Sequence, residues 1–477
     1  MFLDARQELV DLNRSADLVI VGSGHTGMLL AQELADVANV LIVESGGFGA
    51  DDETDALNAG DVIGLPYPLA STRTRQFGGS SNLWAGFCTP FDRNDFEPRS
   101  WVPFSGWPFS ADELAPFMER AALQLNLSCN MFDARQAAND GGCALPQEIL
   151  GRASIWRFGA PTMRINQSGL ARAMHENVSI LLNATVVEII VDAAGSEARR
   201  LLIRTLTGRQ GSITAKQIVL ACGGIETARL LLNSDRQMAG GLGNCHDVVG
   251  RFFMEHPHQH VATFAVDKEK DLAGLVSRVQ SGRGDEIMFN LGISPQEQED
   301  LRILNARAHI YRTPTMGDDE APQLGVFAEQ APNPASKIIL TNRCDALGMR
   351  RIALDWQLTD VDWRTFEETG GVLGAALEAA GLGCRLPVRW SRRDGASILH
   401  SNHHLGTARM AIDPTLGVVD ADARLHGIDN LYIMSGAIFP TVSWANPTLT
   451  LLALTLRLAK HLKAKFIPPE LQAGSNT

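Results

Sequence analysis

The residues from Gly22 to Gly27 have the types and spacing of a phosphate-binding turn. They read Gly-Ser-Gly-His-Thr-Gly and directly follow the apolar run 17–21. The first glycine permits a tight turn, Gly24 lets the backbone approach a pyrophosphate, and Gly27 lets the following helix pack closely against the strand. Amides at the N-terminus of that helix would face the anion. This pattern predicts a binding site for a dinucleotide.

An acidic residue stands where a dinucleotide site needs one. Glu44 lies 20 residues after Gly24 and follows a second apolar run, 40–43. Its carboxylate can accept hydrogen bonds from a ribose diol, and its charge disfavours the 2′-phosphate of NADP. The strand, turn, helix and acid together favour a nucleotide domain over the alternative, a glycine-rich turn in an unrelated α/β protein.

Two further segments favour FAD over NAD. The loop 75–86 contains tandem glycines and hydroxyls, so its amides can cradle a phosphate or a ring edge. The strand-like segment 430–437 precedes a long apolar helix, with Asn446 as the predicted N-cap and Pro447 as its first residue. Partial positive charge at that N-terminus suits the N1/C2=O edge of a reduced flavin. For this segment alone, an ordinary capped helix is the alternative.

The composition excludes several classes of protein. With 42 basic and 54 acidic residues among 477, the formal charge is −12, which argues against nucleic-acid binding. The longest apolar run, 449–459, is too short to span a membrane and contains Arg457. Charged residues near the N-terminus predict no signal peptide. The seven cysteines form no C-x-x-C pair, so we expect a cytoplasmic protein with neither a disulfide framework nor a zinc site.

Predicted strands and helices alternate along the chain, and they must position the candidate site residues. Apolar runs at 178–190, 200–206 and 217–221 predict strands, and 225–233 predicts a helix. Ser110 is the predicted N-cap of a helix over 110–125. Strand-like runs joined by turns between 256 and 360 predict a largely antiparallel sheet, and a helix over 361–381 follows them.

The fold prediction is an α/β chain, α+β overall, that leaves a nucleotide domain and later re-enters it. The length of the chain supports more than one folding unit. We expect a discontinuous, Rossmann-like FAD-binding domain and a substrate-binding domain with an antiparallel sheet. Their expected ranges are 1–90, 165–255 and 395–465 for FAD, 91–164 and 256–394 for the substrate, and 466–477 for a C-terminal tail.

Several segments, in this order, resemble the glucose–methanol–choline (GMC) family of FAD-dependent oxidoreductases. The resemblance covers most of the chain and is strongest in two C-terminal blocks, 403–410 (His-His-Leu-Gly-Thr-Ala-Arg-Met) and 438–450. The glycine turn with Glu44 and the loop 75–86 belong to it as well. So do the segments 219–232 and 329–336.

The resemblance implies oxidation of an alcohol. The first histidine of the 403–410 block matches His403, and the residue before Pro-Thr matches Asn446. A neutral imidazole can take the hydroxyl proton while the carbinol C–H delivers hydride to flavin N5, and the amide fixes the same hydroxyl. Two partners are needed because the C–H and the O–H must point at different groups. His404 is interpreted as a flavin-side residue.

The resemblance and the motifs together predict the residues that bind FAD. Some sugar-oxidising members attach FAD through a histidine where this chain has Leu83, so we expect a non-covalent cofactor. Many members carry an aspartate at the ribityl phosphate of FAD, where this chain reads Ser-Gly-Ala at 435–437. We expect the contact to this part of FAD to be weaker here or to be made by the backbone. The predicted set is Gly22, Ser23, Gly24, Thr26, Gly27, Glu44, Arg75, Gly79, Ser80, Asn82, Leu83, Trp84, Ala85, Val186, Ala221, Cys222, Gly223, His404, Gly436, Ala437, Pro447 and Thr448.

The run from His256 to His260 contains three histidines at alternate positions. Strand alternation would place all three imidazoles on one face, a spacing that metal sites can use. Glu255 is the one carboxylate nearby in sequence, and the family uses no metal. We therefore favour a polar strand face near the substrate.

The predicted function is FAD-dependent oxidation of a CH–OH group on a small molecule, with a sugar or glycoside preferred. Alternatives are an aliphatic or aromatic alcohol substrate, a lyase that holds FAD without using its redox chemistry, and a non-catalytic flavoprotein. The intact pair of His403 and Asn446 argues against the last of these. The electron acceptor, whether a quinone, a dye-like carrier or oxygen, and the oligomeric state stay open.

Overall fold

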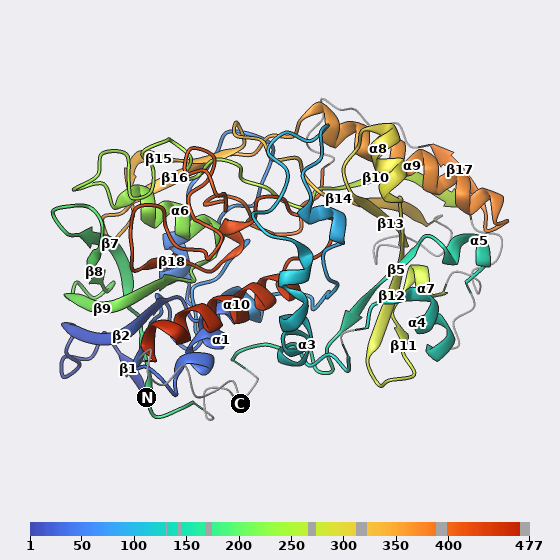
Figure 1. Cartoon of the computed structure of the whole chain (residues 1–477). Coiled ribbons are helices and arrows are strands. Elements are labelled where there is room, and N and C mark those ends of the chain that lie inside the picture. Colours follow the sequence, from blue (N-terminus) through green and yellow to red (C-terminus); the bar gives the residue numbers. More distant parts are fainter. Residues whose placement is uncertain are drawn as a thin grey trace.

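The structure is a computed structural model, shown in Figure 1. A sheet with its helices forms one side of the molecule, and a second sheet with its helices forms the other. The structure describes residues 1–129, 131–141, 145–166, 174–265, 273–311, 322–387 and 398–467.

The first sheet carries the predicted nucleotide unit. Its strand order is β1-β6-β3-β2-β9-β8-β7, and β18 pairs with β9. The strands from β1 to β9 in this order are parallel, while β7, β8 and β9 form antiparallel pairs. The strands are β1 (Phe2–Asp4), β2 (Arg14–Val21), β3 (Val40–Val43), β6 (Val178–Leu182), β7 (Thr185–Val191), β8 (Ala198–Arg204), β9 (Gln210–Leu220) and β18 (Leu431–Ile433).

Helices α1 (His25–Leu34), α6 (Gly223–Asn233) and α10 (Thr448–Phe466) accompany this sheet. β2 and β3 are fully apolar where they pair, because helices cover both faces of such a sheet. Helix α3 (Ala115–Gln124) packs on α10 through a small cluster that includes Ala121 and Leu452. α3 therefore joins the predicted substrate half to the nucleotide half.

The second sheet is antiparallel in every described pairing. Its order is β11-β12-β13-β14-β10-β17, with β5 paired to β12, and helix α9 (Asp360–Ala379) packs against it. This confirms the prediction of a largely antiparallel sheet. The strands are β5 (Ala153–Phe158), β10 (His258–Ala265), β11 (Val279–Gln280), β12 (Glu286–Gly292), β13 (Ala306–Tyr311), β14 (Gln323–Ala328) and β17 (Cys384–Pro387).

A third, small sheet joins the hairpin β15 (Lys337–Cys344) and β16 (Arg350–Asp355) to β4 (Asp61–Val62). It ties together segments that the predicted division assigns to different domains. The remaining helices are short. They are α2 (Asp52–Asp55), α4 (Ala134–Gly141), α5 (Gln147–Leu150), α7 (Ala273–Val276), α8 (Pro295–Leu301) and the 3-10 turns Ala56–Asn58, Gly79–Asn82, Arg93–Phe96, Ala111–Glu113 and Gly436–Ile438.

The fold class agrees with the sequence, but three local predictions are wrong. The run 178–190 is two strands, because Asn183 adopts a left-handed conformation (φ 58°) and turns the chain. Helix α3 begins at Ala115 after a 3-10 turn, and Ser110 makes no side-chain cap. Helix α10 begins at Thr448 with Pro447 as its N-cap, so Asn446 does not cap it.

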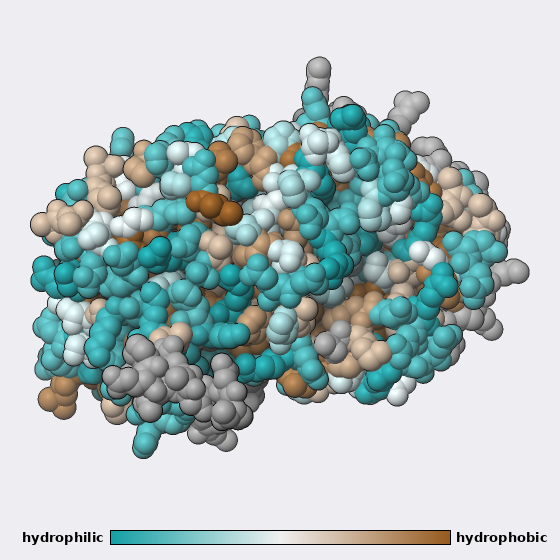
Figure 2. Space-filling model, in the orientation of Figure 1, coloured by the Kyte–Doolittle hydropathy of each residue, from teal (hydrophilic) through white to brown (hydrophobic). Residues whose placement is uncertain are grey.

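The predicted domain division remains a prediction. All strands of the first sheet come from the ranges expected for FAD, and all strands of the second come from the ranges expected for the substrate. Of the predicted tail, residues 468–477 lie outside the described residues. Within the described part of the chain, no helix is long and apolar enough to cross a membrane. The face drawn in Figure 2 is mostly hydrophilic.

Candidate active site

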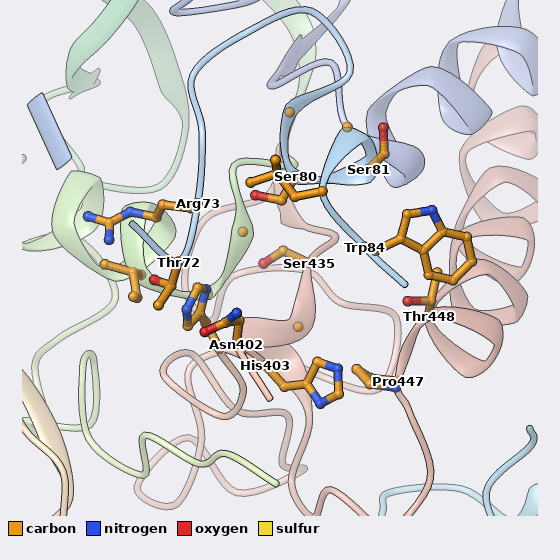
Figure 3. A pocket seen from close by; sticks show the side chains of 18 of the residues that line it. Thr72, Arg73, Ser80, Ser81, Trp84, Asn402, His403, Ser435, Pro447 and Thr448 are labelled. Carbon is orange, nitrogen blue, oxygen red and sulfur yellow. The ribbon is translucent and has the colours of Figure 1, made fainter. Parts of the chain in front are cut away.

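A cavity of about 920 Å³ receives residues from both large sheets and from the C-terminal blocks. At one end lie the β2–α1 turn, Glu44, the loop around Gly79 and the start of α6; we call this end the glycine wall. At the other end lie the residues that we call the histidine wall. These are Trp156, His258, His309, Phe327, His403 and Asn446, together with His256, which lies behind His403. Figure 3 shows part of both walls.

The glycine turn is held by close backbone contacts. Gly22 has φ +105°, and a Cβ atom at Gly27 would lie 2.0 Å from the carbonyl oxygen of Gly22. A Cβ at Gly24 would meet nothing nearer than the carbonyl of Gly78, at 4.0 Å, and so would project into the cavity. Gly22 and Gly27 thus permit the turn, and Gly24 leaves space for a ligand.

Glu44 is buried at the end of β3 and lines the cavity. Its Oε2 atom accepts hydrogen bonds from the amide and the hydroxyl of Ser23 at 3.0 and 2.7 Å, and Oε1 accepts from Gly46 N at 2.9 Å. Burial raises the pKa of this carboxyl, and these three hydrogen bonds oppose the rise. A carboxylate has about four acceptor sites, so one stays available for a ribose hydroxyl.

The hydroxyl of Ser23 also accepts a hydrogen bond from Gly78 N at 2.9 Å, which fixes the loop 78–85 against the glycine turn. Arg75 of the preceding segment pairs with Glu226 at 2.6 Å, and Arg73 pairs with the same carboxylate at 2.9 Å. Burial favours the neutral acid, but the guanidinium groups of these two residues and Arg229 hold the pKa of Glu226 far below its ordinary value. The Glu226 carboxylate is therefore charged, and Arg73 and Arg75 share it.

The glycine wall fits a dinucleotide cofactor. The N-terminus of α1 opens onto the cavity at Gly24, where a ligand has space. The backbone amides of this N-terminus suit a pyrophosphate. His25 and His404 also line the cavity, and the Nε2 atom of each is buried without a hydrogen-bond partner among the described residues. Burial lowers the pKa of His25 to about 4 and that of His404 to about 3, so both imidazoles are neutral. A polar ligand would satisfy these atoms.

The histidine wall contains a pair of imidazoles in direct contact. His403 Nδ1 lies 2.8 Å from His256 Nδ1, and His256 Nε2 lies 2.9 Å from the carbonyl oxygen of Val442. Burial lowers the pKa of His256 to about 4. Burial, and then the neighbouring imidazoles, also hold the pKa of His403 well below its ordinary value. His403 is thus a neutral imidazole that lines the cavity and can accept a proton.

Asn446 lines the same cavity as His403, and its amide has a fixed orientation. The indole Nε1 of Trp156 donates a hydrogen bond to Asn446 Oδ1 at 2.9 Å. This contact replaces the predicted role as a helix cap. Because Oδ1 accepts from the indole, the Nδ2 group is the one left to donate to an oxygen in the cavity.

The structure brings most of the predicted residues together. His403, Asn446 and nineteen of the 22 predicted cofactor residues line the cavity. Gly27, Asn82 and Ala437 lie outside the lining. Gly27 packs on Gly22, the Asn82 amide donates to the carbonyl of Phe77, and the Ala437 amide donates to the Ser435 hydroxyl. In Figure 3, Trp84 lies near Thr448 and the His403 ring lies near Pro447.

The sequence interpretation missed Trp156, His309 and Phe327 in the lining. They come from β5, β13 and β14, whose pairing with β12 and β10 brings them to one site. The alternate histidines did give a signal, but the three imidazoles do not share one role. His258 and His260 line the cavity, whereas His256 contacts His403. Among the described residues, no three His, Cys, Asp or Glu side chains are grouped so as to hold a metal.

Comparison with known proteins gives two family matches. The family model described as FAD dependent oxidoreductase matches residues 17–275, more than half of the chain. The model described as GMC oxidoreductase matches residues 332–455. The first match contains the glycine wall, and the second contains His403 and Asn446.

Several individual proteins are similar over nearly the full chain. The 6'''-hydroxyparomomycin C oxidase of Streptomyces lividus is 24% identical, covering 95% of this chain and 93% of its own. The paromamine 6'-oxidase of Streptomyces fradiae is 23% identical, covering 96% and 93%. The crystal structure of pyridoxine 4-oxidase from Mesorbium loti shares the fold, with a TM-score of 0.64, 21% identity and coverage of 93% and 98%.

Proposed function

The chain belongs to the GMC family of FAD-dependent oxidoreductases, and from this premise we propose that it oxidises a CH–OH group of a sugar or glycoside to the carbonyl. The observation that carries the proposal is the joint presence of a neutral His403 and an oriented Asn446 amide in one cavity with the glycine wall. A cofactor site alone would not need a base and a donor at its far end.

When bound, FAD supplies the acceptor for the hydride that leaves the carbinol carbon. The protein has two tasks at the substrate. His403 takes the hydroxyl proton on its ring nitrogen, which a neutral imidazole can do at neutral pH. Asn446 donates from Nδ2 to the same oxygen and stabilises the negative charge that develops there. Together they hold the hydroxyl so that the C–H bond has a single orientation.

We propose that FAD is held without a covalent bond. Leu83, at the position where some relatives of the GMC family carry a linking histidine, has no group that could form such a bond. Gly22–Gly27, Glu44 and the loop 78–85 would hold the nucleotide by backbone amides and hydrogen bonds. Acid precipitation should therefore release yellow FAD into the supernatant, and flavin that stays with the pellet would contradict this.

The substrate assignment rests on the histidine wall and on the relatives. Imidazole and indole groups supply both polar atoms and flat faces, which suit a ring with several hydroxyls. The two Streptomyces relatives are named for oxidation of aminoglycosides. We also place the protein in the cytoplasm, because Cys88, Cys129, Cys222, Cys245 and Cys344 are free thiols.

The test is anaerobic bleaching of the flavin by a panel of sugars, glycosides and simple aliphatic and aromatic alcohols. We expect a sugar or glycoside to reduce the flavin fastest. Bleaching by none of them, with FAD bound, would overturn the proposal and favour a lyase. Admission of air or of a quinone after bleaching then identifies the electron acceptor. We expect the quinone to act faster, because the histidine wall as described contains no Lys or Arg, and burial holds the pKa of His403 and His258 well below the ordinary value.

A further inference from the structure

The contact between His256 and His403 has a consequence for the base itself. We propose that His256 is a positioning residue that fixes the tautomer of His403, so that the lone pair lies on Nε2, the nitrogen left for the substrate. This inference rests on the proposed function of His403 as the base. It also assigns a role to the first of the three alternate histidines, which the mechanism above does not use.

The assignment follows from a chain of donors and acceptors. The carbonyl oxygen of Val442 can only accept, so His256 Nε2, 2.9 Å away, carries a proton. A neutral His256 then has its lone pair on Nδ1. His403 Nδ1, 2.8 Å from that lone pair, must be the donor. A neutral His403 with its proton on Nδ1 has its lone pair on Nε2, and no other pair of neutral tautomers satisfies both contacts.

The packing around His256 holds its ring in this position. The imidazole is fully buried and stacks on Phe327, with centroids 5.4 Å apart and planes 18° apart. The two imidazoles meet edge to face, at 88° and 4.8 Å. Burial keeps His256 neutral by lowering its pKa to about 4, and a protonated His256 would have no lone pair to offer. His256 therefore stays an acceptor when His403 becomes charged.

One buried carboxylate fixes the backbone of both histidines. Glu255 Oε1 accepts from His403 N at 2.8 Å, and Oε2 accepts from His256 N at 2.8 Å. Tyr67 donates its hydroxyl to Oε1 at 2.7 Å. The backbone of the two histidines is thus anchored to a common group, which holds their rings within reach of one another. The proton taken from the substrate stays on His403 Nε2, and the Nδ1–H bond to His256 stabilises the imidazolium that forms.

Two substitutions separate this role from a merely structural one. In His256→Asn, Oδ1 can take the place of Nδ1 and accept from His403, while the contact to Val442 is lost. In His256→Gln, the amide reaches the place of Nε2 and keeps the contact to Val442, while the acceptor for His403 is lost. His256→Asn therefore keeps an acceptor for His403 Nδ1–H. His256→Gln lacks that acceptor and is the matched control.

The measurements are flavin reduction by the best alcohol of the panel, in anaerobic stopped flow, and ¹⁵N NMR of histidine-labelled holoenzyme, with the His403 signals assigned by difference. We expect His256→Gln to slow reduction at least about 10-fold, since loss of a tautomer-fixing partner costs up to about 10⁴-fold in other enzymes. His256→Asn should recover most of the rate. In wild type, the His403 signals should show a protonated Nδ1 and an unprotonated Nε2.

An Nε2-protonated His403 in the wild-type spectrum would overturn the inference, as would equal rates for His256→Gln and wild type with FAD content unchanged. A His256→Asn variant as slow as His256→Gln, with normal FAD content and melting temperature, would do the same. Failure of the proposed function is distinguishable, because then no alcohol bleaches the wild type. The NMR result still decides the tautomer in that case.

Discussion

The glycine wall and the histidine wall use opposite means to build one cavity. In the glycine wall, short loops place backbone atoms near one another, and the decisive feature is a missing side chain, as at Gly24 and Gly27. In the histidine wall, side chains from six separated segments meet, and the decisive feature is which atom of each ring or amide carries a proton.

This difference determines which property of the protein a substitution in each wall impairs. An added methyl group at Gly22 or Gly27 in the glycine wall collides with backbone that cannot move aside cheaply, so both folding and cofactor binding suffer. An altered nitrogen in the histidine wall leaves the packing intact and removes a proton acceptor or a donor, so the chemical step suffers. The predictions below test whether the two walls can be damaged separately.

The largest effect should come from His403→Ala. Loss of a general base costs about 10²–10⁴-fold, so the rate of flavin reduction by substrate should fall by that factor in anaerobic stopped flow. FAD content should stay at the wild-type level, because the glycine wall is untouched. His404→Ala is the neighbouring control and should keep far more of the rate. If His404→Ala were the inactive variant, the assignment of the base would be off by one residue.

Gly27→Ala should damage the other wall. Its Cβ would lie 2.0 Å from Gly22 O, and overpacking of this kind costs about 1–3 kcal/mol. We expect a lower melting temperature and less FAD per protein, measured after gel filtration. Gly49→Ala is the matched control, because a Cβ there meets nothing within 4 Å. Full FAD content in Gly27→Ala would show that the turn tolerates a side chain.

A smaller effect is expected from Trp156→Phe, which removes the donor to Asn446 Oδ1 and keeps an aromatic ring. A net hydrogen bond contributes about 0.5–1.5 kcal/mol, so flavin reduction should slow about 3- to 10-fold while FAD stays bound. Trp101→Phe removes an indole donor to Ile303 O outside the cavity and should leave the rate unchanged. Equal rates of flavin reduction for the two variants would show that the hydrogen bond from Trp156 is not needed to orient Asn446.

The same contrast explains what could be predicted from the sequence. The glycine turn, Glu44 and the antiparallel sheet follow from spacing and alternation over a few residues, and the blocks at His403 and Asn446 form a recognisable family pattern. Trp156, His309 and Phe327 reach the site only through the register of β5, β13 and β14. No local pattern encodes that register.

The capping error has a related cause. Asn446 before Pro447 has the sequence of a helix cap, and the local rule alone predicts it. In the fold, the Trp156 indole reaches the same amide from a strand 290 residues away and takes its oxygen, and the helix begins two residues later, at Thr448. A tertiary contact thus overrides a local propensity, at a residue to which we assign a role in the reaction.

A last expected effect concerns the charge of the substrate. Among the described residues of the histidine wall, no side chain is a carboxylate, and burial followed by neighbouring imidazoles keeps His258 neutral by holding its pKa well below its ordinary value. An ammonium group would enter this wall without a counter-charge. A neutral sugar should therefore reduce the flavin faster at pH 7 than its amino derivative.

The size of this preference is limited, because the amine can lose its proton before it binds. For an amine with a pKa near 8, deprotonation at pH 7 costs about 1.4 kcal/mol, which is about 10-fold in the second-order rate constant of flavin reduction. At pH 9 the amine is neutral in solution, and the two sugars should react at similar rates. The measurement is stopped-flow reduction by the matched pair at both pH values. A faster amino sugar at pH 7 would show that a carboxylate faces the histidine wall.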